Sequence, residues 1–242
     1  MPKTAHELTR KEMKGPDRFQ VAAADAAHWM AGRQKQLAIV AVVILAVAAF
    51  AVAVSSYRDS RRSNAGGLLY DAINVAGGEV SSIPLPNPDG PIYKTEDEKA
   101  RAVLTAATKV REAYSGTRAA TTALLLQGDA QLTLRDWDKA IASYQAFLAD
   151  APADDTLRFG ALDGLARAQE GKGDLDAAAR TYEKAAEIGF FKDRAMLERA
   201  RLLAKAGKAD EARTVVESVA KDSKEPALQA EAQERLARLG GK

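Results

Sequence analysis

The residues of this chain that could do chemistry are few. The sequence has no cysteine, and its two histidines, His6 and His28, both precede a long apolar segment. Without cysteine there is no disulfide, zinc–thiolate site or thiol nucleophile, and without histidine the rest of the chain lacks the usual base for a serine nucleophile. We therefore expect neither a cofactor nor a metal site.

Carboxylates are the remaining candidates for acid–base catalysis, and Asp129, Asp136 and Asp138 form the nearest cluster. Asp136 and Asp138 fall in an expected turn before a helix, a position that aspartate commonly takes. We therefore expect that the protein is not an enzyme, with an enzyme based on these carboxylates as the alternative. The formal net charge is only +2, so the overall charge does not favour binding to nucleic acid.

The elements that position these residues begin with an apolar run. Residues 37–54 read LAIVAVVILAVAAFAVAV, without a charge. As a helix this run spans about 27 Å, close to the hydrocarbon thickness of a bilayer. We predict a single transmembrane helix. The alternatives are a buried core helix and a cleaved signal peptide, although the preceding tail is long for a signal peptide.

The tail, residues 1–36, is short and charged, with a break at Gly15-Pro16. Beyond the break, apolar residues recur at helical spacing and predict an amphipathic helix that runs into the membrane segment. A docking site for a membrane partner is the second interpretation of this stripe. The tail's predicted contacts with the membrane interface are Trp29, Arg33 and Lys35.

Residues 55–116 predict a helical hairpin with a long proline-rich connection. The first helix is expected over residues 57–78 and to stop at Gly77-Gly78. A loop follows over residues 81–93, and Thr95 is the expected N-cap of the second helix.

From residue 117 the chain repeats itself. Three helix–turn–helix units align on Ala140, Ala178 and Ala212, and their turns read LRDWDKA, KGDLDAA and AGKADEA. The first step is longer because four residues are inserted around Ala153–Thr156. The third unit departs from the others, since it lacks the aromatic residue after its alanine and has a charged Arg199 at a normally apolar position. A last helix over residues 226–239 is expected to cap the array.

Over residues 117–224 these units resemble the tetratricopeptide repeat (TPR) family of 34-residue helical hairpins. The expected fold is therefore all-α: one transmembrane helix, then a TPR-type α-solenoid of about three repeats and a capping helix within residues 117–242. The resemblance implies that the protein binds other proteins or peptides.

The order of the segments also resembles that of bacterial single-span proteins typified by the ancillary subunit of the SecYEG translocon. That resemblance implies a protein of the bacterial inner membrane with a cytoplasmic N-terminus, a periplasmic TPR domain, contact with the translocon and chaperone-like handling of exported proteins. Basic residues flank the apolar run on both sides, so charge favours this orientation only slightly, and cytoplasmic repeats remain an alternative. An envelope scaffold coordinating cell division, cell-wall or outer-membrane assembly is the alternative function.

The resemblance also places one row of residues on the inner face of the array, where a partner would bind. The row mixes apolar side chains with both signs of charge, as a protein-binding groove does, and the alternative is a merely solvated face. The candidate residues are Leu125, Asp129, Leu132, Asp163, Arg167, Glu170, Arg194, Leu197 and Arg201. Phe190-Phe191 is a further feature, because two adjacent aromatics cannot face one core, and we expect packing under the insertion rather than exposure.

Overall fold

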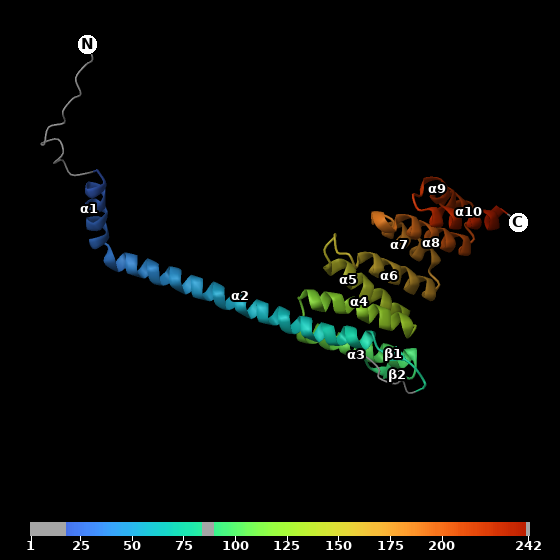
Figure 1. Ribbon diagram of the computed structural model, residues 1–242, viewed down its shortest axis with the longest axis horizontal. Helices are drawn as coiled ribbons and strands as arrows, with labels where there is room; N and C mark the ends of the chain where they lie inside the picture. The colour runs from blue at the N-terminus through green and yellow to red at the C-terminus, as the bar shows by residue number, and fades with distance from the viewer. Residues whose placement is uncertain (1–17, 84–89, 241–242) are drawn as a thin grey trace, which may run out of the picture. The chain divides into compact units, whose positions relative to one another are not determined.

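The computed structural model describes residues 18–83 and 90–240, so the predicted break at Gly15-Pro16 lies outside the described residues. The chain divides into two units, Met1–Asp59 and Ser60–Lys242. The helices and strands are labelled in Figure 1. In the N-terminal unit, α1 (Arg18–Ala31) is followed by a turn, and α2 (Gln34–Ala76) then begins. The helix predicted in the tail is present as α1, but a turn at Gly32 and Arg33 separates it from α2, since glycine is a poor helix former.

The apolar run lies in α2, and its side chains face away from any core. Ile39, Leu45 and Phe50 are 64%, 68% and 72% exposed. The most apolar window of α2 has a mean hydropathy of 3.2, and none of it is buried. Among the described residues, α2 is the one helix long and apolar enough to cross a membrane. A buried core helix does not have such exposed side chains.

The helix predicted over residues 57–78 is not a separate element. It is the C-terminal part of α2, so residue 54 is not the end of a helix. The predicted stop is confirmed, since α2 ends at Ala76, directly before Gly77-Gly78. In the C-terminal unit, Ala65 and Ala72 of this helix are fully buried.

The proline-rich connection contains a pair of two-residue β-strands, called the strand clip below, which we did not predict from the sequence. Strands β1 (Glu79–Val80) and β2 (Ile92–Tyr93) pair in parallel, with Glu79 opposite Ile92 and Val80 opposite Tyr93. Residues 84–89 of the connection lie outside the described residues. Gly78 allows the clip to close, because a Cβ there would lie 2.6 Å from the Pro91 carbonyl oxygen.

Eight α-helices and a short 3-10 helix follow in the described part of the C-terminal unit. Thr95 caps α3 as predicted, since its hydroxyl accepts a hydrogen bond from the Glu98 amide at 3.1 Å. The elements are α3 (Glu96–Ala113), α4 (Arg118–Thr133), α5 (Trp137–Asp150), α6 (Arg158–Lys172), α7 (Leu175–Ala185), η2 (Gly189–Phe191), α8 (Lys192–Lys205), α9 (Ala209–Asp222) and α10 (Pro226–Gly240).

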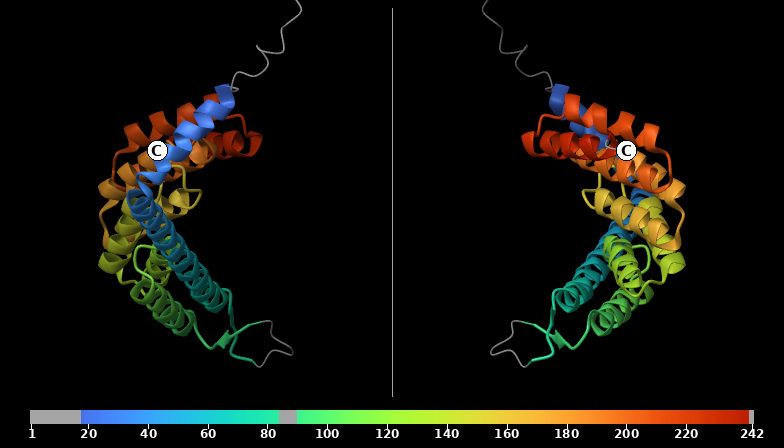
Figure 2. Two further views of the ribbon diagram at one scale, coloured as in Figure 1. Left: turned by 90° about the vertical axis from the view of Figure 1, so that its left-hand side faces the viewer. Right: turned by 90° about the vertical axis from the view of Figure 1, so that its right-hand side faces the viewer.

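The three predicted repeats correspond to the helix pairs α4–α5, α6–α7 and α8–α9, and α10 follows as the capping helix. Ala140, Ala178 and Ala212 are each fully buried, which confirms the alignment on these alanines. Small residues at these positions let neighbouring helices approach closely, and each hairpin then buries its apolar face against the next. Figure 2 shows helices α3 to α10 following one another along a curved path.

The insertion between α5 and α6 is tied to the array. Arg158 donates hydrogen bonds to the carbonyl oxygens of Leu148 and Ala151 at 2.9 and 3.0 Å, and so satisfies the end of α5. Phe191 stacks on Phe159 with ring centroids 3.9 Å apart. Its neighbour Phe190 is 83% exposed. The expectation of packing holds for Phe191 and is wrong for Phe190, whose ring touches that of Phe191 edge-on, with centroids 4.9 Å apart, but otherwise faces solvent.

Candidate protein-binding groove

The inner face of the array is formed by the first helix of each repeat and by the capping helix. Helix α4 contacts α6, and α8 contacts α10, while α5 and α7 have no comparable contact with each other. Helices α6 and α8 are joined on the same side by the ion pair of Glu170 with Arg201, and the approach of alternate helices marks the shorter, concave side of a helical array. The groove is therefore lined by α4, α6, α8 and α10.

The candidate residues of α4 and α6 reach this face. Asp129 and Arg167 are exposed, whereas the side chains around them are half-buried. The half-buried positions on these two helices are Leu125, Leu132, Asp163 and Glu170.

Two tyrosines support the groove from below. The Tyr144 hydroxyl donates to Asp129 at 2.6 Å, and the Tyr182 hydroxyl donates to Asp163 at 2.7 Å. Both rings are almost completely buried, and burial together with the adjacent carboxylate raises the pKa of each phenol well above its usual range. The tyrosines therefore stay protonated and hold the two aspartates in fixed positions as acceptors.

An ionic network joins the second repeat to the third. The Arg201 guanidinium forms a bidentate pair with the Glu170 carboxylate at 2.8 and 2.7 Å, and Lys205 contacts the same carboxylate at 2.9 Å. The hydrogen bond from Arg201 is the main cause that lowers the pKa of Glu170 to about 2. Arg201 also donates to Glu198. Glu170 and Arg201, predicted separately, are thus one connected unit across α6 and α8.

The prediction fails for Leu197. This side chain is 1% exposed and belongs to the core, so it cannot line an open groove. The reason is the capping helix, because Arg235 of α10 donates to the Leu197 carbonyl oxygen at 2.7 Å and Leu236 and Leu239 pack against the same core. Arg194, in the first turn of α8, is exposed.

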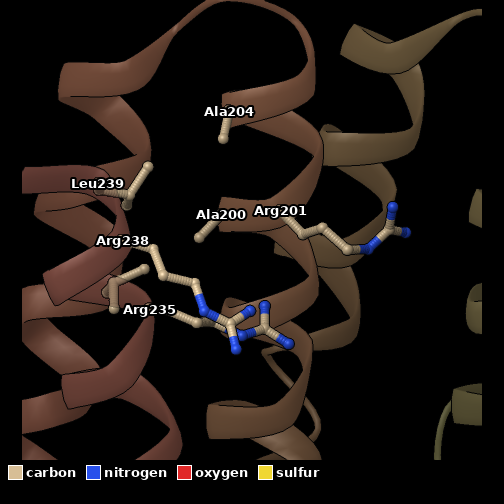
Figure 3. A pocket seen from close by; sticks show the side chains of 7 residues that line it. Ala200, Arg201, Ala204, Arg235, Arg238 and Leu239 are labelled. Carbon is tan, nitrogen blue, oxygen red and sulfur yellow. The ribbon is translucent and has the colours of Figure 1, made fainter. Parts of the chain in front are cut away.

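Two pockets open on the inner face near the ends of the array. One, of about 270 Å³, lies between the end of α2 and helices α3 and α4, and Asp129 forms part of its wall. The other, of about 290 Å³, lies between α8 and α10 and is also lined by Val216 of α9; Figure 3 shows its labelled lining residues on α8 and α10. Its lining also includes Ala200, Arg201, Ala204, Arg235, Arg238 and Leu239.

Of the residues that line this second pocket, only Arg201 was predicted from the sequence. Arg235, Arg238 and Leu239 belong to the capping helix, which we expected only to terminate the array. A signal was present, since both arginines lie on the edge of the apolar stripe of that helix. At the N-terminal end of the chain, Trp29 and Arg33 are in contact, with the guanidinium carbon 4.7 Å from the indole ring centre, and Lys35 is exposed.

The sequence between residues 28 and 194 matches the family described as tetratricopeptide repeat-like domain. The match covers more than half of the chain, and the chain belongs to this family. A comparison with curated proteins finds no match. Among solved structures, the chain is similar to a crystal structure of nearly identical TPR-like repeats of a kinesin light chain from Podosopora anserina. The two share 18% identity with a TM-score of 0.49, over 58% of this chain and 77% of that one.

The family and the fold together define the class of protein. The chain is all-helical with TPR-like repeats, and TPR domains bind other proteins. The family match begins before the apolar run and ends in the first turn of α8, so most of the third repeat and all of α10 lie beyond it.

Proposed function

We propose that this protein is a membrane-anchored interaction module whose inner face binds segments of other proteins. The observation that carries the proposal is that the groove is lined both by half-buried leucines and by charged side chains in fixed positions. Asp129, for example, is fixed by the hydrogen bond that it accepts from the buried Tyr144. A pre-organised surface of this kind loses little entropy on binding. The anchor, residues 37–54, keeps the groove at the membrane and raises its local concentration there.

The proposed location is the bacterial inner membrane, with the TPR domain on the periplasmic side. Two observations support an anchor: no residue of the apolar window of α2 is buried, and the family match includes this window. Trp29 stacked under Arg33 suits a headgroup layer, where an indole and a cation are both favoured. The proposed partners are the Sec translocon and exported proteins, which the protein would assist as a chaperone-like factor.

Topology can be tested because the chain has no cysteine of its own. Single cysteines are placed at Lys3 and at the exposed Lys224, and intact cells are treated with an impermeant thiol reagent. The proposal expects labelling at 224 and none at 3. Labelling at 3 alone would place the repeats in the cytoplasm, and a mature chain that lacks both the tail and the apolar run would favour a cleaved signal peptide.

Partners are tested by purifying the full chain from membranes in detergent, beside a variant that inverts the groove charges, Asp129→Arg with Arg167→Asp. We expect translocase subunits or exported proteins with the wild type and much less of them with the variant. Recovery of division or cell-wall proteins instead would favour the envelope scaffold. Equal recovery with both chains would contradict binding through the groove.

A further inference from the structure

The pocket between α8 and α10 exists because the third repeat lacks a tyrosine. Tyr144, Tyr182 and Val216 occupy the same position of the three repeats, four residues after the aligned alanine. In the first repeat the tyrosine ring fills the space between adjacent inner helices, since a Cβ on Gly128 of α4 or on Gly164 of α6 would collide with it. Val216 is too short to fill the equivalent space.

A second substitution widens the opening. Leu132, Glu170 and Ala204 occupy equivalent positions on the inner helices of the three repeats. In the second repeat Glu170 fills this position and binds Arg201. In the third repeat Ala204 leaves it open, and with Ala200, Val216 and Leu239 it gives the pocket an apolar interior.

The polar groups that line this pocket are all hydrogen-bond donors. Three arginines belong to the lining, and no carboxylate does. Figure 3 shows the guanidinium groups of Arg235 and Arg238 side by side at one edge, while Arg201 extends away from them.

The arginines keep donors available for a ligand. Arg235 is held by Glu198, Glu231 and the Leu197 carbonyl oxygen, which fixes its position. Arg238 has one partner, Glu234, in an exposed pair four residues apart on the same helix. Such a pair contributes only about 0.3–0.5 kcal/mol, so an incoming carboxylate can replace Glu234. A guanidinium has five N–H donors, of which this pair uses one.

We propose that this pocket binds an acidic protein segment through one large apolar side chain. The apolar side chain enters the space left by the missing tyrosine and packs on the partly buried Ala204 and Leu239, above the buried Ala200 and Val216. Carboxylates next to it in the segment pair with Arg235 and Arg238. This inference rests on the proposed function, since the pocket is the C-terminal end of the same groove, and it assigns to that groove a partner chemistry and a fixed anchoring point.

The test uses the full chain in detergent and fluorescence anisotropy with short labelled peptides. The first peptide has one phenylalanine between pairs of glutamates. The second has alanine in place of phenylalanine, and the third has lysines in place of glutamates. We expect the first to bind at least about tenfold more tightly than the other two, because both the apolar side chain and the carboxylates contribute. Equal binding of the lysine peptide would overturn the inference.

Two kinds of variant then locate the site. Arg238→Glu reverses an exposed charge, with Arg213→Glu on α9 as the matched control, since Arg213 also forms an exposed pair four residues apart, with Glu217. We expect affinity for the acidic peptide to fall about tenfold or more with the first and to be unchanged with the second. Ala204→Leu fills the pocket with the residue of the first repeat and is expected to reduce binding of the phenylalanine peptide to the level of the alanine peptide.

The outcomes separate this inference from the proposed function. If the acidic peptide binds wild type, Arg238→Glu and Ala204→Leu equally well but is lost with Arg167→Glu, the groove binds protein and the pocket is not the anchoring point. If none of the peptides binds while the chain still recovers proteins from membranes, the proposed chemistry is wrong and the function stands. If no peptide binds and no protein is recovered from membranes, both this inference and the proposed function are wrong.

Discussion

Replacing Gly164 with alanine tests the packing that builds the groove. A Cβ at this position of α6 would lie 2.3 Å from Cζ and 2.5 Å from the hydroxyl oxygen of Tyr144. The ring cannot retreat toward α4, because it is already so close to Gly128 that a Cβ there would lie 2.7 Å away. Either the tyrosine leaves its rotamer and its bond to Asp129, or α6 shifts away from α4.

The magnitude follows from two opposing effects. Overpacking a well-packed core costs about 1–3 kcal/mol, and this site belongs at the upper end because both sides of the ring are confined. Alanine in a helix is favoured over glycine by about 1 kcal/mol. The net loss is therefore about 2 kcal/mol, and for a unit of this size the melting temperature falls by about 4–8 °C.

Gly160 on the same helix provides the control, since a Cβ there would have no atom within 4 Å. Gly160→Ala should raise the stability by up to about 1 kcal/mol. Thermal and urea unfolding of the full chain in detergent, followed by circular dichroism, measures both variants. In a Tyr144→Val background, which copies the third repeat, Gly164→Ala should lose most of its cost. If Gly164→Ala is as stable as Gly160→Ala, the account of tyrosine packing is refuted.

Three further predictions follow from burial and charge. The pKa of Glu170 is lowered to about 2 from its ordinary 4.5, so its charged form stabilises the fold above pH 4.5, and this contribution is lost as the pH falls toward 2. In Glu170→Gln the melting temperature should therefore depend less on pH between 4.5 and 2 than it does in the wild type. Leu197→Ala should cost about 2–5 kcal/mol in urea unfolding, since the side chain is fully buried, whereas Leu125→Ala at a half-buried position should cost less; equal costs would place Leu197 in the groove after all. Leu45→Arg places a charge at the middle of the apolar run at a cost of about 2.5–3.5 kcal/mol, so more of the chain should be extracted from membranes by alkaline carbonate than with Tyr57→Arg beyond the run; identical extraction would count against a spanning helix.

Much of the fold could be read from local patterns. The aligned alanines, the stop at Gly77-Gly78 and the Thr95 cap depend on residues close in sequence, where helix packing and capping impose strict preferences. The strand clip could not be predicted, since it joins two-residue segments across a proline-rich loop. The continuity of α2 was also missed, because a change from apolar to polar residues alters the surroundings of a helix without ending it.

The site was only partly predictable for a related reason. Periodicity placed Leu197 on the same row as Leu125, but the burial of that row in the third repeat depends on how α10 packs over it. The absence of an aromatic residue at position 216 was visible in the sequence as a departure from the repeat pattern. Its consequence, a pocket beside two arginines of another helix, required the three-dimensional arrangement.

The most direct test of binding through the inner face is photo-cross-linking in living cells. A photoreactive residue replaces either Arg167, exposed on the inner helix α6, or Arg180, exposed on the outer helix α7. We predict a protein cross-link from position 167 and little or none from position 180. Cross-links of equal yield from the two faces, or a cross-link from position 180 alone, would contradict a groove on the inner face.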